Sequence, residues 1–247
     1  MDEPMNKVAL VTGAGRGIGA ATAKLLAKQG YKVCINYRTK ADSAQQVVAD
    51  IERQGGTAFT VAADVSQENE VIKLFQAINE QYGTVTHIVN NAGILFAQST
   101  LAELSVERFN KVLITNVTSC FLCCREAIKQ MPNGGAIVNV SSAASRIGAP
   151  GEYIDYAASK GAMDSLTKGL SLELAERNIR VNAVRPGFID TDMHADGGEP
   201  NRVQRLSPQI PLKRGGTATE VANSIAWLLS DEASYVTGTF IDIAGGK

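Results

Sequence analysis

The chain has 247 residues, of which 45% are hydrophobic and 20% are charged, and its formal net charge is −1. This composition is typical of a globular protein with a sizeable core, and the balanced charge supplies no field that would attract nucleic acid or a membrane surface. Nothing in the chain resembles a transmembrane run of about 20 apolar residues, and the acidic start lacks the apolar segment of a signal peptide, so the cytoplasm is the expected location.

Short runs rich in β-branched residues alternate with amphipathic stretches along the chain. The predicted strands span residues 7–13, 32–37, 58–65, 85–93, 135–142, 179–187 and 238–246. The predicted helices span residues 13–30, 41–56, 68–83, 105–131, 156–178 and 217–234. Seven strands alternating with six helices predict right-handed βαβ units. The expected fold class is therefore α/β, a single-domain Rossmann-type doubly wound sheet of mostly parallel strands with helices on both faces.

No linker or low-complexity tract interrupts this alternation, so residues 1–247 are expected to form one domain. Ligands of such sheets bind beyond the carboxyl ends of the strands, where the strand order reverses. Residues of about 191–213 follow the sixth strand at that end, are polar, and contain Gly197 and Gly198 as hinge residues. We expect a substrate lid there; the alternative is a disordered surface loop.

A glycine-rich turn, "TGAGRGIG", follows the first strand at residues 12–19. Gly13, Gly17 and Gly19 permit positive φ angles and a close approach of backbone to ligand. The helix that follows presents free N–H groups and a positive dipole end to a phosphate. The spacing differs from the common G-x-G-x-x-G fingerprint. Nucleotide binding is predicted here, with a plain tight turn as the alternative.

The second strand ends in Asn36, Tyr37 and Arg38, where proteins that bind NAD usually have an acidic residue for the ribose 2′-hydroxyl. Arg38, together with Arg16 of the glycine turn, suits a 2′-phosphate. NADP(H) is therefore predicted over NAD(H), and two solvated arginines are the alternative. The other predicted cofactor contacts flank the glycine turn or end later strands: Ile18, Asp64, Val65, Asn90, Asn91, Ala92, Gly93, Pro186, Gly187, Ile189 and Thr191.

Four cysteines are present: Cys34, Cys120, Cys123 and Cys124. Two of them form a C-x-x-C, but the chain offers no second pair, and neither His87 nor His194 lies at a metal-ligand spacing. They are predicted to be small buried apolar side chains, and no metal site is predicted.

Six motifs, in this order, resemble the short-chain dehydrogenase/reductase family in its compact form of about 250 residues: "TGAGRGIG", "NNAG", "ITNV", "NVSS", "YAASK" and "RPGFIDT". The chain is similar to bacterial glucose dehydrogenases, 3-oxoacyl-carrier-protein reductases and oxidoreductases with the run "PGEYIDYAASK". The resemblance implies a catalytic group of Asn116, Ser142, Tyr156 and Lys160, with the last two also contacting the cofactor. It also implies a homotetramer. Tyr153 is excluded as the catalytic tyrosine, because Ala157 follows it at the lysine position.

Tyr156 and Lys160 lie four residues apart and share a helix face. The Lys160 ammonium is expected to lower the pKa of Tyr156, so that the phenol can give a proton to a carbonyl oxygen or take one from an alcohol. Ser142 is suited to hold the substrate oxygen. The resemblance implies that Asn116 holds a water that links Lys160 to solvent; a tie within its helix is the alternative. The predicted reaction is hydride transfer between nicotinamide C4 and a small-molecule carbonyl or secondary alcohol.

The sequence leaves two other functions open. A non-catalytic nucleotide-binding sensor on the same fold is the main alternative, but it does not need Ser142, Tyr156 and Lys160 together. A sugar-nucleotide epimerase or dehydratase shares the Tyr-x-x-x-Lys motif but usually has a longer C-terminal substrate region. The polar lid, which contains His194, favours a polar substrate over a sterol, and residues 172–174 lack the arginines expected for docking an acyl carrier.

Overall fold

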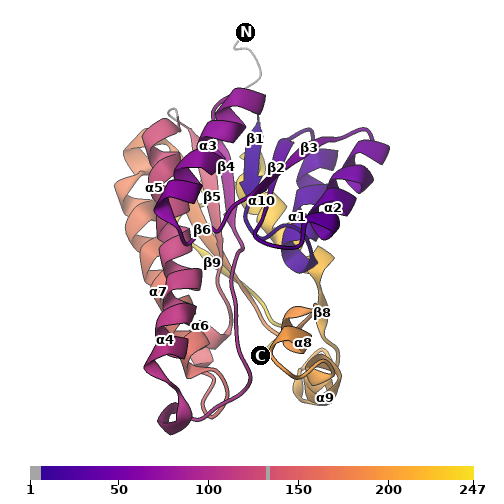
Figure 1. The fold of residues 1–247 in the computed structure, drawn as a ribbon. Coiled ribbons are helices and arrows are strands. Elements are labelled where there is room, and N and C mark those ends of the chain that lie inside the picture. Colours follow the sequence, from indigo (N-terminus) through magenta and orange to yellow (C-terminus); the bar gives the residue numbers. More distant parts are fainter. Residues whose placement is uncertain (1–6, 132–133) are drawn as a thin grey trace.

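The computed structural model describes residues 7–131 and 134–247. Seven parallel strands form one sheet in the order β3-β2-β1-β4-β5-β6-β9 (Figure 1). They are β1 (Val8–Val11), β2 (Lys32–Tyr37), β3 (Thr57–Ala62), β4 (His87–Asn90), β5 (Gly135–Val140), β6 (Ile179–Pro186) and β9 (Phe240–Ile243). The predicted doubly wound α/β fold is confirmed, and all seven predicted strands are present.

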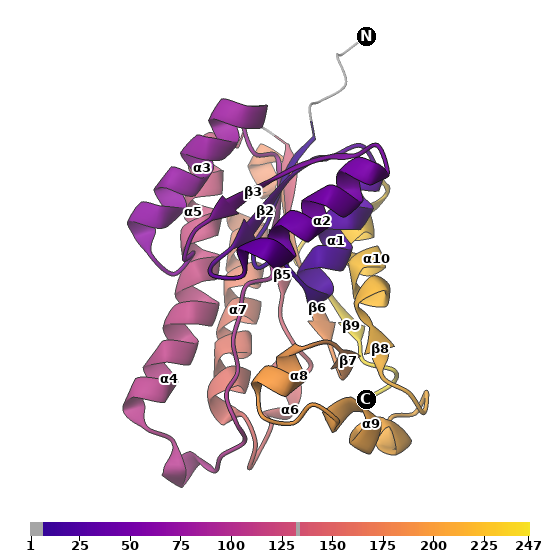
Figure 2. The same ribbon diagram turned by 45° about the vertical axis from the view of Figure 1, so that its right-hand side comes forward.

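Helices cover both faces of the sheet (Figures 1 and 2). One face carries α1 (Gly17–Lys28), α2 (Ala41–Arg53) and α10 (Ala218–Leu229). The other carries α3 (Glu68–Tyr82), α4 (Val106–Leu113), α5 (Ser119–Gln130) and α7 (Ile154–Glu173). Short helices make the connections: α6 (Ala144–Ile147), α8 (Met193–Asp196), α9 (Arg202–Leu206) and 3₁₀ turns at Leu101–Glu103, Ala175–Arg177, Ser207–Gln209 and Asp231–Ala233.

The core lies in two layers, one on each face of the sheet. Alternate residues of β1 enter different layers: Ala9 and Val11 pack with α1, α2 and α10, whereas Val8 and Leu10 pack with α3, α5 and α7. All four are fully buried. This explains the continuous apolar runs in the sequence, because a parallel strand covered on both faces has no side exposed to water.

The predicted helix at 105–131 is interrupted by a single π-helical segment, Ile114–Thr118, which lies between α4 and α5. Ser105 starts α4, and its hydroxyl accepts a hydrogen bond of 3.1 Å from the backbone N–H of Arg108. A π turn adds one residue to a helical turn and is often found at functional sites. Asn116 lies in its middle.

The segment at 191–213 contains two helices, α8 and α9, rather than an irregular loop. A second, two-stranded parallel sheet that the sequence did not predict frames it: β7 (Ile189–Asp190) pairs with β8 (Gly216–Thr217). Figure 2 shows α8 and α9 beyond the carboxyl ends of β6 and β9. The segment therefore lies at the end of the sheet where the sequence places the ligand.

All four cysteines are buried and free, as the sequence analysis expected. Cys120, Cys123 and Cys124 point from α5 into the core beside the sheet. Within residues 7–131 and 134–247, no helix combines the length and apolar character needed to cross a membrane.

His87 is expected to make folding sensitive to mild acid. Burial lowers its pKa to about 4, and the nearby charges of Lys7 and Arg180 act in the same direction. Since the unfolded chain titrates near the ordinary pKa of about 6.5, the unfolded state binds more protons between pH 6.5 and 4. The free energy of unfolding should therefore fall by up to about 3 kcal/mol as the pH drops through this window.

Urea denaturation at several pH values measures this effect. His87→Phe keeps a ring but cannot titrate, so its unfolding free energy should depend less on pH between 6.5 and 5 than that of the wild type. His194→Gln removes the chain's other histidine. Burial lowers the pKa of His194 as well, so this variant measures how much of the pH dependence belongs to that residue instead of His87. Equal pH slopes in the wild type and His87→Phe would contradict the assignment.

Candidate active site

The glycine turn after β1 has the backbone geometry that only glycine accepts readily. Gly13 and Gly17 have φ angles of 62° and 55°. A Cβ atom on Gly13 would lie 3.1 Å from the Cα of Ala92, and one on Gly19 would lie 2.7 Å from the carbonyl oxygen of Gly13. Side chains at these positions would therefore push the turn away from the segment after β4.

The turn leads into an uncapped helix end. No side chain caps the start of α1, and the first turn of this helix holds no acidic residue. Its backbone N–H groups therefore keep their hydrogen-bonding capacity, and the helix dipole favours an anion there. This arrangement fits the phosphates of a dinucleotide.

A cavity of about 250 Å³ lies between the glycine turn and the ends of β2, β3 and β4. Thirteen of the predicted cofactor residues line it: Gly13, Arg16, Gly17, Ile18, Asn36, Tyr37, Arg38, Asp64, Val65, Asn91, Ala92, Gly93 and Thr191. Other lining residues were not predicted from the sequence: Gly15, Thr39, Lys40, Ser43, Ala63, Ile94, Thr115, Asp192 and Met193. Lys40 follows Arg38 in the run "RTK", and this basic spacing is a signal that could have identified it.

Three predicted contacts hold the cavity's framework together. The side chain of Asn36 accepts from the backbone N–H of Gly13 at 3.3 Å and donates to the carbonyl of Ala63 at 3.0 Å. Asn90 is buried away from the cavity and donates to Asn139 of β5 at 2.9 Å. Gly19 is buried within α1. Asn36 therefore both supports and lines the cavity, whereas Asn90 and Gly19 support it from outside.

Both predicted phosphate-binding arginines lie at the cavity and pair with aspartates. Arg16 forms ion pairs with Asp192, at 3.7 Å, and with Asp196 of α8. Arg38 lies 3.7 Å from Asp64, and about half of its side chain is exposed. Exposed pairs of this kind are weak, so these guanidinium groups remain accessible to a stronger anion.

A second cavity of about 150 Å³ continues from the first, and Ile18, Asn91, Thr191 and Met193 line both. It contains the remaining predicted residues of the site: Ser142, Tyr156, Lys160, Pro186, Gly187 and Ile189. The structure thus brings three of the four side chains of the predicted catalytic group, Ser142, Tyr156 and Lys160, into one cavity adjacent to the glycine turn.

Lys160 is held in the interior of the protein. Lys160 is only 3% exposed, and its Nζ donates a hydrogen bond to the carbonyl of Val140 at 2.7 Å. Burial lowers the pKa of Lys160 to about 8, although the charge of Asp164 opposes this. The Nζ lies 5.4 Å from the centroid of the Tyr156 ring, so an ammonium there faces the phenol.

The pKa of Tyr156 differs from the sequence-based expectation. Burial raises the pKa of Tyr156 to about 12, and a hydrogen bond with the Ser142 side chain opposes the rise. The expected lowering of the Tyr156 pKa by Lys160 is therefore wrong for this structure, in which loss of solvation is the dominant influence on the phenol. The phenol is fully protonated at neutral pH and can act as a proton donor.

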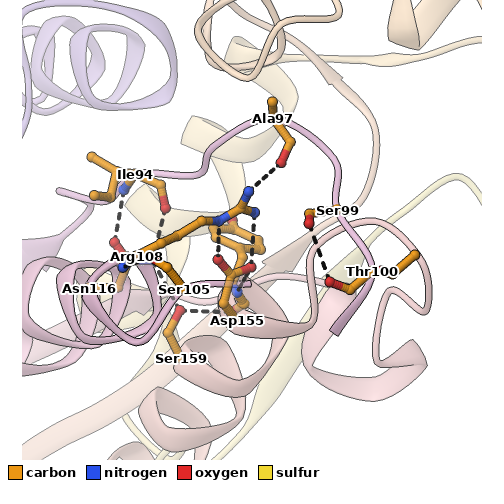
Figure 3. A network of polar contacts seen from close by, with 10 residues as sticks. Ile94, Ala97, Ser99, Thr100, Ser105, Arg108, Asn116, Asp155 and Ser159 are labelled. Carbon is orange, nitrogen blue, oxygen red and sulfur yellow. Dashed lines mark hydrogen bonds and ion pairs between the residues drawn. The ribbon is translucent and has the colours of Figure 1, made fainter. Parts of the chain in front are cut away.

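Asn116 lies beside this group but lines neither cavity. Its side chain forms a reciprocal pair with the backbone of Ile94: it accepts from the N–H at 2.8 Å and donates to the carbonyl at 3.0 Å (Figure 3). It also donates to Ser159 of α7 at 3.0 Å. A Cβ on Gly93 would lie 3.3 Å from Asn116 Oδ1 and 3.6 Å from Lys160 Nζ, so all three are neighbours.

Several lining residues of the second cavity were not predicted from sequence. Tyr153, dismissed as a catalytic tyrosine, lines the cavity with a buried hydroxyl that has no hydrogen-bond partner. Arg202 of α9 lies over its ring, at 5.0 Å, and pairs with Glu152 and Glu199. His194 is also at the cavity and is half-buried rather than solvated. These contacts join segments far apart in the sequence, so no local motif announces them.

Comparisons with known proteins agree with this geometry. A family model described as enoyl-(acyl carrier protein) reductase matches residues 13–247. The chain is 61% identical over 245 residues to the uncharacterized oxidoreductase YgfF of Escherichia coli K12, covering 97% of this chain and 99% of that protein. It is 41% identical over 244 residues to 3-oxoacyl-(acyl-carrier-protein) reductase FabG of Staphylococcus epidermidis, covering 98% and 99%.

The fold of the chain is also similar to that of solved structures. A mutant of a Serratia marcescens short-chain dehydrogenase/reductase superposes with a TM-score of 0.91 at 34% sequence identity, and 97% of each chain is covered. The family match and the relatives extend over nearly the whole chain. The chain belongs to the short-chain dehydrogenase/reductase family of oxidoreductases.

Proposed function

We propose that this protein is an NADP(H)-dependent oxidoreductase that interconverts a carbonyl and a secondary alcohol, with Tyr156 as general acid and base. The observation that carries the proposal is the presence of Ser142, Tyr156 and Lys160 in one cavity that continues into the cleft at the glycine turn. FabG, by its name, reduces a 3-oxoacyl group, which is a carbonyl. A non-catalytic sensor has no use for this group.

Tyr156 moves the proton. In the reducing direction its protonated phenol donates to the carbonyl oxygen as negative charge develops there. Ser142 hydrogen-bonds the same oxygen and orients it towards the phenol. In the oxidising direction the phenol must first lose its proton, and the Lys160 ammonium stabilises the resulting phenolate. A bound nicotinamide dinucleotide supplies or accepts the hydride.

Asn116 supports this group from outside the cavity. Its hydrogen bonds to Ile94 and Ser159 hold the segment after β4 against α7, close to Lys160. These bonds join Asn116 to other segments rather than tie its own helix. The water that would link Lys160 to solvent stays a prediction from the family resemblance. The catalytic group is therefore proposed to comprise Asn116, Ser142, Tyr156 and Lys160.

The cofactor preference for NADP(H) over NAD(H) rests on charge. Arg16, Arg38 and Lys40 all line the first cavity, and no acidic side chain occupies the end of β2. A 2′-phosphate carries the negative charge that these groups would pair with. The predicted cofactor contacts, with Tyr156 and Lys160 at the nicotinamide end, follow the course of the two joined cavities.

Residues 191–213 are proposed to act as the substrate lid, because Met193, His194 and Arg202 line the second cavity. The proposed substrate is a small-molecule carbonyl or alcohol, and the proposed location is the cytoplasm. Large apolar side chains are exposed on α5, α7 and α10, namely Phe121, Leu172 and Trp227. Such surfaces favour association between copies, in agreement with the homotetramer that the family resemblance implies.

Tyr156→Phe should lower kcat by at least about 10²-fold, because general acid–base catalysis typically contributes 10²–10⁴-fold. The measurement is the loss of NADPH absorbance with a panel of ketones, aldehydes, sugars and acyl thioesters. NADPH affinity, followed by fluorescence, should change little. Tyr153→Phe is the matched control, since it removes a neighbouring cavity hydroxyl. Wild-type turnover in Tyr156→Phe would refute the assignment and favour the sensor.

Arg38→Ala should raise the KM for NADPH by about 10–100-fold, because hydrogen bonds to charged groups contribute about 1.5–3 kcal/mol. The KM for NADH should remain within about twofold of the wild type, since NADH has no 2′-phosphate. Arg53→Ala, on the exposed end of α2, is the control for loss of a surface arginine. Equal changes with both coenzymes would show that Arg38 does not read the phosphate.

Reduction should slow in mild alkali. The free protein's Lys160 has a pKa lowered to about 8, and kcat/KM reports groups of the free enzyme. If the ammonium supports the reaction, kcat/KM for reduction decreases as the pH rises through about 8, because Lys160 loses its proton there. Lys160→Met should be slow and lack this titration. A wild-type profile that stays flat to pH 9.5 would contradict the role of Lys160.

A further inference from the structure

Arg108 joins three separate parts of the chain (Figure 3). It lies in the first turn of α4, and its side chain is only 19% exposed. The guanidinium donates to the carboxylate of Asp155 on α7, at 2.8 Å, and to the backbone carbonyl of Ala97 after β4, at 2.7 Å. The Phe96 ring lies 5.5 Å away on the same segment. Neither cavity is lined by Arg108 or Asp155.

Asp155 directly precedes Tyr156 and is 1% exposed. Its Oδ1 accepts from the backbone N–H of Tyr156 at 2.9 Å, while its Oδ2 accepts from Arg108. A carboxylate this deep in the protein requires a partner, because an unpaired buried charge is strongly unfavourable. The position of the guanidinium therefore determines where the first turn of α7 can lie.

A second tie holds the other end of the same helical turn. Ser159 accepts a hydrogen bond from Asn116, and Asn116 pairs with the backbone of Ile94. The turn of α7 from Asp155 to Ser159 is thus anchored to the segment after β4 twice, through Arg108 to Ala97 and through Asn116 to Ile94 (Figure 3). Tyr156 lies between the two anchors.

The two anchors affect the position of Tyr156 relative to the first cavity. Ile94 lines the first cavity and Tyr156 lines the second. Ties between their segments set the separation between the phenol and the wall of the dinucleotide cleft. A misplacement of about 1 Å in such a site can reduce the rate about 100-fold.

We propose that Arg108 is a positioning residue for Tyr156, acting through the Asp155 carboxylate. The inference rests on the proposed function, since it gives Arg108 a purpose in the same reaction. Arg108 sets the distance between the Tyr156 phenol and the wall of the dinucleotide cleft, and it contacts neither substrate nor cofactor itself.

The test separates positioning from folding with three variants. Arg108→Ala removes the tie, Arg108→Lys keeps the charge but cannot reach both acceptors with one planar group, and Arg108→Ala with Asp155→Asn removes the unpaired charge as well. Thermal unfolding should show that the double variant regains stability relative to Arg108→Ala. Its kcat should nevertheless stay at least about 10-fold below wild type, with the KM for NADPH within about twofold and an increased solvent deuterium isotope effect.

A second readout does not require turnover. Protein labelled at the tyrosine ring carbon that carries the hydroxyl gives six resonances to resolve, and Tyr156→Phe assigns the one from Tyr156. This resonance should shift in Arg108→Ala and in the double variant, and shift less in Arg108→Lys. Arg180→Ala is the control, because Arg180 also joins a helix through backbone carbonyls but lies at the start of β6, far from the site.

The outcomes are distinct. A double variant with wild-type kcat and an unmoved Tyr156 resonance overturns the inference, as does an equal shift in Arg180→Ala. If the wild-type protein reduces no carbonyl compound, the proposed function fails, and the Tyr156 resonance alone then decides whether Arg108 positions the phenol.

Discussion

The hydrogen bond from Lys160 to the carbonyl of Val140 is the contact on which the site depends. An ammonium in the interior is costly unless its donors are used, so α7 can pack on the sheet only where this carbonyl is available. Val140 ends β5, and Ser142 follows two residues later. Tyr156 lies one turn before Lys160 on α7. One bond between a helix and a strand end therefore brings the serine, the phenol and the ammonium to the same cavity.

The parallel sheet brings the other polar residues of the site to the same edge. Each strand ends at the same edge, so the polar residue after each one reaches a common region. The side chain of Asn91, after β4, donates to the carbonyl of Thr12, after β1, at 2.9 Å. The Thr12 hydroxyl in turn accepts from the backbone N–H groups of Asn91 and Ala92. These bonds join the two strands at the point where the strand order reverses, and the glycine turn fits against them.

The sequence predicts these features because they are local. Strands covered on both faces appear as continuous apolar runs, which is why residues 32–37 match β2 without error. Several of the motifs lie at strand ends, so their order along the sequence follows the order of the strands. The features that the sequence did not predict depend on distant pairings. Arg108 contacts Asp155 across 47 positions, and β7 pairs with β8 across the segment that contains α8 and α9. The raised pKa of Tyr156 likewise follows from burial by segments distant in the sequence.

Residues 191–213 form both buried and exposed ion pairs with the rest of the protein. Arg202 of α9 is 4% exposed and pairs with Glu152, which precedes α7, and with Glu199. Breaking these pairs would leave a buried charge unpaired, so α9 is firmly attached to the body of the protein. Arg16 pairs with Asp192 and Asp196 near solvent, where ion pairs contribute little and salt screens them. Arg16 belongs to the glycine turn, so an anion bound there would compete with Asp192 and Asp196 for its guanidinium, whereas the ion pairs of α9 do not involve that turn.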